Sequence, residues 1–459
     1  MAWNVVIAGG GFGGFYAART LEKVLPPNST RVTLVNDVNF MLYTPLLPGA
    51  AGGALEPRHV VVPLREELKS TQLRIGTVTG GDPAAKTLTV AGLDGSTSEL
   101  PYDELIVAVG SVSKTLPVPG LAEHAIGFKA LPEAIELRNR LLRSLETAEA
   151  LDDPVARAPW LTFVFVGAGY AGLEGLAELQ DFAADLIERY PKCRTQGMRW
   201  ILVEAKDRVM TEIQPDLAEF GTRELRSRGI EILTGTTLDA VTADTARLST
   251  GETVPCRTVV WTAGVKAHPV VADLGLELTP QGRIVTDRTM KVAGQEHVWA
   301  IGDAAAVPDP AKDRQVSCPP TAQHAIRQGR LVAKNVAAAM GTGKVRKFTY
   351  KTKGVFVDMG QREAVASTMG IKWRGKPAWF LARTYHLAMM PGGLKRKSRL
   401  LIDWNVQLLF GRDTSELGRL GRPPRLSEPT GGGTPTSASA HEDAPEDARG
   451  EAVAGSTPS

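Results

Sequence analysis

The stretch GAGYAGLE occupies residues 167–174, and a similar stretch, AGGGFGG, occupies residues 8–14. Each follows an apolar run and contains the spacing Gly-x-Gly-x-x-Gly. In such a turn the first glycine permits a tight turn, the second lets the backbone approach a pyrophosphate, and the third allows a helix to pack closely on a strand. The phosphates then lie at a helix N-terminus, whose free N–H groups and dipole favour anions. The glycines concerned are Gly9, Gly11, Gly14, Gly167, Gly169 and Gly172.

Both turns lie inside a strand–helix–strand unit. Compact apolar runs, typical of buried parallel strands, come before each turn, and a helical sequence that ends near a proline comes after it. In chain order, the expected strands and helices of the two units are 3–8, 13–25, 31–35, 162–166, 171–189 and 200–203. The duplication predicts an α/β protein with two Rossmann-like dinucleotide-binding domains.

The end of the second strand differs between the two units. In the second unit it is Glu204, whose carboxylate is expected to accept from both ribose hydroxyls and to repel a 2′-phosphate, which favours NADH over NADPH. Lys206 and Arg208 lie close enough to weaken that preference. In the first unit the position holds Asn36, followed by Asp37, and an amide can bind a hydroxyl without bringing a charge. The alternatives are an ordinary strand-end charge for Glu204 and plain turn residues for the other two.

Length and composition limit the class of protein. The chain has 459 residues, of which 43% are hydrophobic and 22% charged, as in a folded protein of two or three domains. A net charge of +3 argues against a dedicated nucleic-acid binder. The three cysteines are far apart, so no redox dithiol and no metal site is expected. Neither a signal peptide nor an apolar run of about 18 residues is visible, which makes a cytoplasmic location the expectation.

Two unlike dinucleotide sites in one chain suggest electron transfer between them. FAD facing NADH is the economical solution, because a flavin accepts a hydride and releases electrons singly or in pairs. The later strand HVWAIGD ends in Gly302 and Asp303, which places a carboxylate where it can bind the ribityl hydroxyls of a flavin. Because this strand follows the second unit, the FAD domain is expected to be discontinuous, with the NADH domain inserted. Glu174, in the first turn of its helix, either complements the helix dipole or lies near the reacting rings.

Seven motifs occur in a recognisable order between residues 9 and 329: GGGFGG, YTPLLPGAAGG, YDELIVAVGS, VGAGYAGLE, VVWTAGV, WAIGDAA and PPTAQHAIRQG. Together they resemble the type II NADH dehydrogenases, which are flavoproteins with two dinucleotide-binding domains, over roughly residues 3–420. The resemblance implies a peripheral membrane enzyme that oxidises NADH with FAD. It also implies that the electrons pass to a quinone and that no protons are pumped.

The resemblance implies site residues motif by motif. Contacts with FAD are implied for Gly9, Gly11, Gly14, Thr44, Pro45, Gly110 and Asp303. The NADH site is implied to contain Gly167, Gly169, Gly172, Glu174, Glu204 and Gly264. Ala322 and Gln323 would lie under the flavin ring and beside the quinone. The family commonly has a second glutamine one helical turn after the first, where this chain has Arg327.

Arg327 leaves the identity of the electron acceptor less well defined than the NADH half-reaction. A fixed cation beside a quinone would stabilise a reduced, anionic ring, plug the site, or select a more acidic acceptor. A flavin-bound redox sensor or scaffold with poor quinone turnover is therefore an alternative, as is an NADH-dependent reductase with a different acceptor. A sulfide:quinone oxidoreductase is disfavoured, because Cys318 alone lies near the expected site.

The C-terminal part has a composition of its own. Residues 372–399 contain eight basic residues and no acid, interleaved with aromatic and long apolar side chains, and the apolar-rich run 400–410 follows. This pattern predicts amphipathic helices on an anionic lipid surface, at the cytoplasmic face of the cell membrane. The alternative is packing on the flavin domain or on a second subunit of a homodimer. The expected boundaries are 1–115 and 281–345 for the FAD domain, 116–280 for the NADH domain, 346–420 for the membrane-attachment region and 421–459 for a disordered tail.

Overall fold

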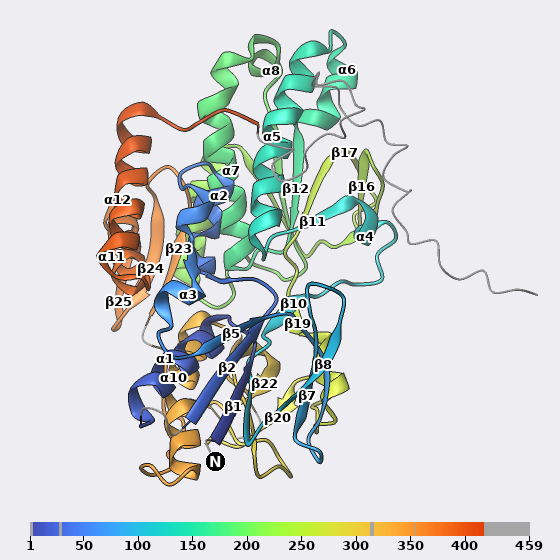
Figure 1. The fold of residues 1–459 in the computed structure, drawn as a ribbon. Helices are drawn as coiled ribbons and strands as arrows, with labels where there is room; N and C mark the ends of the chain where they lie inside the picture. Colours follow the sequence, from blue (N-terminus) through green and yellow to red (C-terminus); the bar gives the residue numbers. More distant parts are fainter. Residues whose placement is uncertain (1–2, 27–29, 313–315, 353, 417–459) are drawn as a thin grey trace, which may run out of the picture. The chain divides into compact units, whose positions relative to one another are not determined.

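The computed structural model describes residues 3–26, 30–312, 316–352 and 354–416, so the expected disordered tail at 421–459 lies outside the described residues. The first α/β unit is built on a five-stranded parallel sheet in the order β21-β9-β1-β2-β5 (Figure 1). Its strands are β21 (Val298–Ala300), β9 (Glu104–Val107), β1 (Trp3–Ala8), β2 (Thr30–Asn36) and β5 (Gln72–Ile75). Helix α1 (Phe12–Val24) connects β1 to β2 and packs against α10 (Ala322–Ala339).

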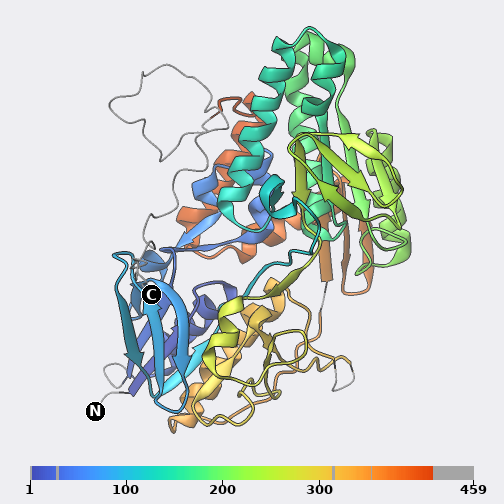
Figure 2. The same cartoon turned by 90° about the vertical axis from the view of Figure 1, so that its right-hand side faces the viewer.

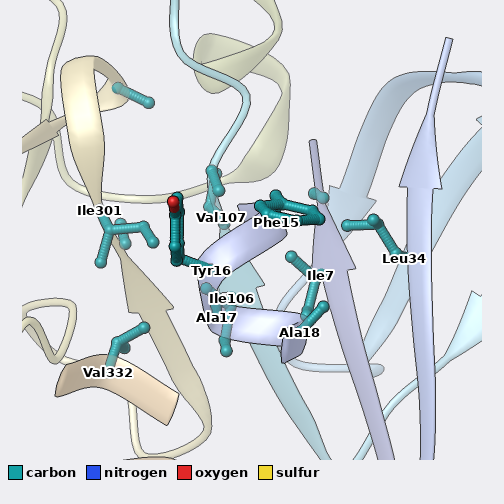
Figure 3. Packing of buried hydrophobic residues seen from close by; sticks show 14 of the residues in the cluster. Ile7, Phe15, Tyr16, Ala17, Ala18, Leu34, Ile106, Val107, Ile301 and Val332 are labelled. Atoms are coloured by element: carbon teal, nitrogen blue, oxygen red, sulfur yellow. The ribbon is translucent and has the colours of Figure 1, made fainter. Parts of the chain in front are cut away.

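The core of this unit explains why its strands are continuous apolar runs. Ile7, Leu34 and Ile106, on three neighbouring strands, are fully buried. Phe15 of α1 and Val332 of α10 belong to the same buried cluster (Figure 3). Because helices and loops cover the sheet, its central strands have no polar face to present to water.

The second α/β unit repeats the plan. Its parallel sheet has the order β11-β18-β12-β13-β14. The strands are β11 (Ala125–Gly127), β18 (Thr258–Trp261), β12 (Thr162–Val166), β13 (Arg199–Glu204) and β14 (Ile230–Thr234), and the main helices are α5 (Leu131–Ala150), α7 (Tyr170–Leu186) and α9 (Pro215–Ser227). The helix expected at 171–189 is α7 followed by a separate 3-10 turn, Ile187–Arg189.

An antiparallel ribbon joins the two sheets. Strand β10 (Ser111–Ser113) follows β9 of the first sheet, β19 (Val265–Ala267) follows β18 of the second sheet, and the two strands pair with each other. Figure 2 shows two chain segments running between the α/β units. Because ligands of parallel α/β sheets bind beyond the carboxyl ends of the strands, the ribbon ties the two ligand-binding edges together.

Smaller elements complete the two units. An antiparallel meander is formed by β6 (Thr77–Asp82), β7 (Thr87–Ala91) and β8 (Thr97–Pro101), and another by β15 (Leu238–Val241), β16 (Thr245–Leu248) and β17 (Thr253–Pro255). The short strands are β3 (Phe40–Leu42), β4 (Val61–Pro63), β20 (Ile284–Val285) and β22 (Ala305–Ala306). The short helices are α2 (Leu47–Ala51), α3 (Leu64–Glu67), α4 (Leu121–His124), α6 (Pro154–Arg157) and α8 (Pro191–Gln196).

The C-terminal part consists of a small sheet and two helices. Strands β23 (Gly354–Asp358), β24 (Ala364–Thr368) and β25 (Ile371–Arg374) are antiparallel and precede α11 (Lys376–Met389) and α12 (Gly393–Phe410). Among the described helices, none combines the length and the apolar character that crossing a bilayer requires.

The basic residues of this part do not form a single lipid-facing patch of two helices, as the sequence had suggested. Lys372 and Arg374 lie on strand β25 and both pair with Asp216 of α9. Lys395 pairs with Glu66, and Arg396 is 5% exposed. Ion pairs with other elements, and burial, therefore take up several of the basic residues between 372 and 399.

Candidate active site

The first glycine turn lies between β1 and α1. Gly9 has a positive φ of 101°, and a Cβ added to Gly14 would lie 1.8 Å from the carbonyl oxygen of Gly9, so both positions require glycine. A Cβ added to Gly11 would meet no atom of the described residues within 4 Å, which leaves open space in front of the turn. In the part of the chain that the structure describes, no side chain caps α1, so its first N–H groups are available for an anion. The turn fits the pyrophosphate of a dinucleotide.

Asn36 braces this turn. Its Oδ1 accepts a hydrogen bond of 2.7 Å from the backbone N–H of Gly10, and its Nδ2 donates to the carbonyl of Val38 at 2.8 Å. The adjacent Asp37 is exposed. The amide of Asn36 therefore serves first to hold the loop.

The other expected FAD residues gather around the same edge of the sheet. The Cβ position of Gly9 abuts the carbonyl of Ala108, two residues before Gly110. The N–H of Gly302 donates to Oε1 of Gln328 on α10 at 2.8 Å. Ala322 is the first residue of α10, whereas Thr44 and Pro45 start the 3-10 turn Thr44–Leu46. The neighbouring Tyr43 contacts Phe12 of the glycine turn, with ring centroids 5.6 Å apart.

Asp303 belongs to a short polar chain that sequence reasoning missed. Its Oδ2 accepts a hydrogen bond of 2.6 Å from the hydroxyl of Ser111, which in turn accepts one of 2.8 Å from Nζ of Lys129. Burial lowers the pKa of Lys129, although the carboxylate of Asp303 opposes the shift. Ser111 is the last residue of the motif YDELIVAVGS, but no motif marks Lys129. With the open turn, this carboxylate and its partners fit FAD.

The second glycine turn lies between β12 and α7 and has the same geometry. Gly167 has a φ of 104°, and a Cβ at Gly172 would lie 2.1 Å from the carbonyl oxygen of Gly167. A Cβ at Gly169 would lie more than 4 Å from any other atom that the structure describes around it. Oε2 of Glu204 accepts a hydrogen bond of 2.7 Å from the N–H of Ala168, as Asn36 does in the first turn. Two dinucleotide cradles of equal design are thus braced by a neutral amide in one case and by a carboxylate in the other.

The basic residues near Glu204 point into their own loop. Arg208 donates to the carbonyls of Met210, Thr211 and Ile213, and Nζ of Lys206 donates to the hydroxyl of Thr211 at 2.9 Å. Gly264 has a φ of 97° and lies beyond the end of β18, with open space beside it.

Glu174 faces a small cavity of about 40 Å³ between α7, α11 and the segment that contains Pro45. Its Oε1 accepts a hydrogen bond of 3.0 Å from the backbone N–H of Asp358. Burial raises the pKa of Glu174 to about 8. His386 of α11 lines the same cavity, and burial lowers its pKa to about 4. Glu174 is therefore not a solvated helix-end charge.

Gln323 is held by strand β23 and by Tyr350, which lies in the segment just before that strand. Nε2 of Gln323 donates to the carbonyl of Gly354 at 3.0 Å, and Oε1 accepts from the hydroxyl of Tyr350 at 2.6 Å. Arg327 shares the helix face of Gln323, as the spacing predicts, and its guanidinium lies 4.0 Å from the centroid of the Tyr350 ring. Tyr350 carried no sequence signal.

Gln323 and Glu174 lie at opposite ends of one strand. Gly354 at the start of β23 binds Gln323, and Asp358 at its end binds Glu174. Four strand steps correspond to about 13 Å, so the two side chains are not in contact with the same atoms.

Comparison with known proteins agrees with this architecture. The family model of the pyridine nucleotide-disulphide oxidoreductases matches residues 3–329, which include both glycine turns, and the chain belongs to this family. Within it the chain belongs to the type II NADH:quinone oxidoreductases. The protein of that name, Ndh, from Mycobacterium tuberculosis is 31% identical over 424 residues, which cover 89% of this chain and 89% of the relative.

A second relative and a solved structure extend the comparison. The demethylphylloquinone reductase NdbB of Synechocystis is 29% identical over 419 residues, covering 87% of this chain and 97% of the relative. The structure of NDH2 from Plasmodium falciparum in complex with NADH superimposes with a TM-score of 0.83 at 17% identity, covering 90% of this chain and all (100%) of that chain. At this identity the superposition shows a shared fold, the α/β dinucleotide-binding flavoprotein fold.

Proposed function

We propose that the chain is an FAD-dependent NADH:quinone oxidoreductase that does not pump protons. The observation that carries the proposal is the ribbon of β10 and β19. It pairs the segment after Gly110 of the first sheet with the segment after Gly264 of the second, and so joins the carboxyl-end edges of the two sheets, where the glycine turns lie. When bound, FAD accepts a hydride from NADH and returns two electrons to the acceptor.

The chain's own residues bind and orient the two dinucleotides. Gly11 and Gly169 admit the pyrophosphates to the starts of α1 and α7. Asp303, with Ser111 and Lys129, binds ribityl hydroxyls. Glu204 accepts from ribose hydroxyls and repels a 2′-phosphate, which makes NADH the preferred donor. We assign the FAD domain to 1–115 and 281–345, the NADH domain to 116–280 and the membrane-attachment region to 346–420.

The acceptor side contains a fixed amide and an acid that is protonated near neutral pH. Gln323, oriented by Tyr350 and Gly354, is placed to contact a quinone beside Ala322. Glu174 holds a proton at its carboxyl group, because burial raises its pKa to about 8. Pro45, one of the residues assigned to the FAD site, lines the same cavity as Glu174, which suits proton delivery to a reduced quinone.

We also propose that α11 and α12 attach the protein to the cytoplasmic face of an anionic membrane. Large apolar side chains are exposed along these helices, and Phe410, at the end of α12, is 82% exposed. The others are Phe380, Leu394, Leu401, Ile402, Val406, Leu408 and Leu409. Many large apolar side chains exposed on two neighbouring helices favour a membrane or protein interface, and a lipid-soluble acceptor favours the membrane.

Vesicle binding tests the attachment. Wild-type protein should cosediment with vesicles that contain phosphatidylglycerol, and the double variant Leu409→Glu/Phe410→Glu should bind at least about tenfold more weakly, since apolar burial drives the attachment. Leu93→Glu is the control, because Leu93 is 82% exposed and lies outside α11 and α12. The homodimer would be supported instead by three results together. The wild type would be a stable dimer in light scattering, the double variant would be a monomer, and the wild type would not bind vesicles.

Anaerobic mixing experiments test the catalytic proposal. Protein reconstituted with FAD should be yellow, should bleach when NADH is added, and should recover its absorbance when a short-chain ubiquinone or menadione follows. Bleaching without recovery by any quinone would overturn the acceptor assignment in favour of a redox sensor. A colourless protein after reconstitution would overturn the function altogether.

A further inference from the structure

Two cavities meet at Glu178. The inner cavity, about 40 Å³, is lined by Glu178 together with Glu174 and Asp358. The outer cavity, about 950 Å³, lies between α7, α11 and α12, and Asp181 and Asp185 line it. Three described residues line both cavities, namely Glu178, Arg383 and Trp404, and Glu178 is the carboxyl among them. Its side chain therefore lies between the wide outer space and the small space at Glu174.

The carboxyl group of Glu178 is buried and incompletely paired. The residue is 5% exposed, and Oε2 has no hydrogen-bond partner among the described residues. The guanidinium of Arg412 lies 3.7 Å from Oε2, which is an ion-pair distance longer than a hydrogen bond. A buried carboxyl oxygen without a hydrogen bond is costly. This atom is thus placed to hold a proton or to exchange one with water.

The inner side offers two receivers for that proton. Glu174 precedes Glu178 by one turn of α7, so the two side chains share a helix face. Asp358 reaches the same cavity from β23 and donates its backbone N–H to Glu174 at 3.0 Å. The cavity has room for a few water molecules, which can link carboxyl groups that do not touch.

We propose that Glu178 passes protons from the outer cavity to Asp358 and Glu174, and so supplies the proton that the proposed NADH:quinone reaction consumes. NADH, one proton and a quinone give NAD⁺ and a quinol, so each turnover draws one proton from solution. A solvent proton forms an O–H bond at Glu178, and this bond breaks when the proton moves through cavity water to the inner carboxyls. The inner acid returns to its carboxylate when it protonates the reduced quinone.

The electrostatic setting supports exchange near neutral pH. Burial raises the pKa of Glu174 to about 8 and that of Asp358 to about 7. Burial also raises the pKa of Glu178, and the positive charge of Arg412 opposes that shift. The other charged groups that face these carboxyls are Asp181 on α7, Arg383 on α11 and Arg228 at the end of α9. An acid with a pKa near the working pH both gains and loses its proton readily.

Half-reaction kinetics on the full-length, FAD-loaded protein test the relay. Glu178→Gln and Asp358→Asn should leave NADH-driven bleaching of the flavin at the wild-type rate. Each should slow reoxidation by menadione by about 10²-fold, the scale of lost acid catalysis. Small weak acids such as acetic acid should restore part of the rate in Glu178→Gln by carrying protons into the outer cavity. Glu188→Gln, a matched change at a 66% exposed side chain near the end of α7, should behave as wild type.

The outcomes separate the relay from the function on which it depends. Normal reoxidation rates in both variants between pH 6 and pH 9, with an unchanged solvent isotope effect, would overturn the relay and leave the quinone reductase intact. Failure of the wild type itself to react with menadione would overturn the proposed function. Melting temperatures of the two variants within a few degrees of wild type would exclude misfolding as the cause of a slow reoxidation. Loss of the bleaching step in either variant would also contradict the relay, since it would place these carboxyls on the NADH side.

Discussion

The hydroxyl of Tyr350 donates a hydrogen bond of 2.6 Å to Oε1 of Gln323, while the guanidinium of Arg327 lies over the Tyr350 ring. The same guanidinium donates to the backbone carbonyl of Gln323 at 2.9 Å. Arg327 therefore acts on Gln323 through Tyr350 and through the helix, and its charge is directed toward an aromatic ring. These contacts indicate a role that differs from the three considered from the sequence, which is to hold the amide of Gln323 in place.

Removing the Tyr350 hydroxyl should weaken quinone use. Tyr350→Phe leaves Oε1 of Gln323 without its donor, and one hydrogen bond is worth about 1 kcal/mol, so KM for the quinone should rise about fivefold. Flavin bleaching by NADH should not change. Tyr102→Phe is the control, because the buried Tyr102 hydroxyl has no hydrogen-bond partner among the described residues. Equal KM values in the two variants would refute the positioning role.

Two alanine substitutions in the second turn should have different effects. Gly169→Ala adds a Cβ in open space, so the melting temperature should stay near wild type while the dissociation constant for NADH rises at least about tenfold. Gly172→Ala forces a Cβ to within 2.1 Å of the Gly167 carbonyl oxygen, so it should also lower the melting temperature. NADH binding by Gly169→Ala at wild-type strength would show that this cradle does not hold the pyrophosphate.

Glu204 should control the choice of nicotinamide cofactor. Glu204→Gln keeps an acceptor for the N–H of Ala168 but removes the charge that repels a 2′-phosphate. The ratio of kcat/KM for NADH to that for NADPH should fall about tenfold, which corresponds to about 1.4 kcal/mol. Asp207→Asn, which removes an exposed charge from the same loop, controls for general electrostatics. A ratio that changes equally in both variants would argue against a specific contact.

Glu174 should make folding stability depend on pH. Burial raises its pKa from 4.5 to about 8, so the folded protein holds a proton there that the unfolded chain has released. This contribution to the free energy of unfolding is complete below pH 4.5 and is lost as pH rises through about 8. Urea titrations of Glu174→Gln should show a smaller loss of stability across this window than wild type. Parallel curves for the two proteins would mean that Glu174 is ionised in the fold at pH 7.

Arg412 should contribute far more to stability than an exposed arginine nearby. Its side chain is 3% exposed and pairs with Asp181 at 2.6 Å and Asp185 at 3.1 Å. Arg412→Met leaves the buried Glu178 and the partly buried Asp181 without this cation and should cost about 3–5 kcal/mol in urea unfolding. Arg143→Met removes the more exposed pair with Glu416 and should cost about 1 kcal/mol or less. Similar costs for the two changes would show that water reaches Arg412 freely.

Local patterns were sufficient to predict the nucleotide-binding framework. The strands at 3–8 and 162–166 were predicted to the residue, because each is a buried apolar run followed by a glycine turn. The discontinuous first sheet follows from the position of HVWAIGD, and β21 does pair with β9. Helix α10 starts at Ala322, where the hydroxyl of Thr321 accepts from the N–H of His324 and caps the helix, as a threonine before a helical run favours.

The amino-acid sequence by itself determined the two α/β units, their turns and the difference between Asn36 and Glu204, because each depends on residues within one strand–helix–strand segment. The tertiary structure alone decided which side chains of distant segments meet. Tyr350 reaches Gln323, Lys129 reaches Ser111 and Asp358 reaches Glu174 only because separate segments pack together. The tertiary structure also pairs basic residues of the segment 372–399 with acids, since Lys372 and Arg374 both contact Asp216 of α9. Burial and pairing depend on contacts across the whole fold, and no local periodicity encodes them.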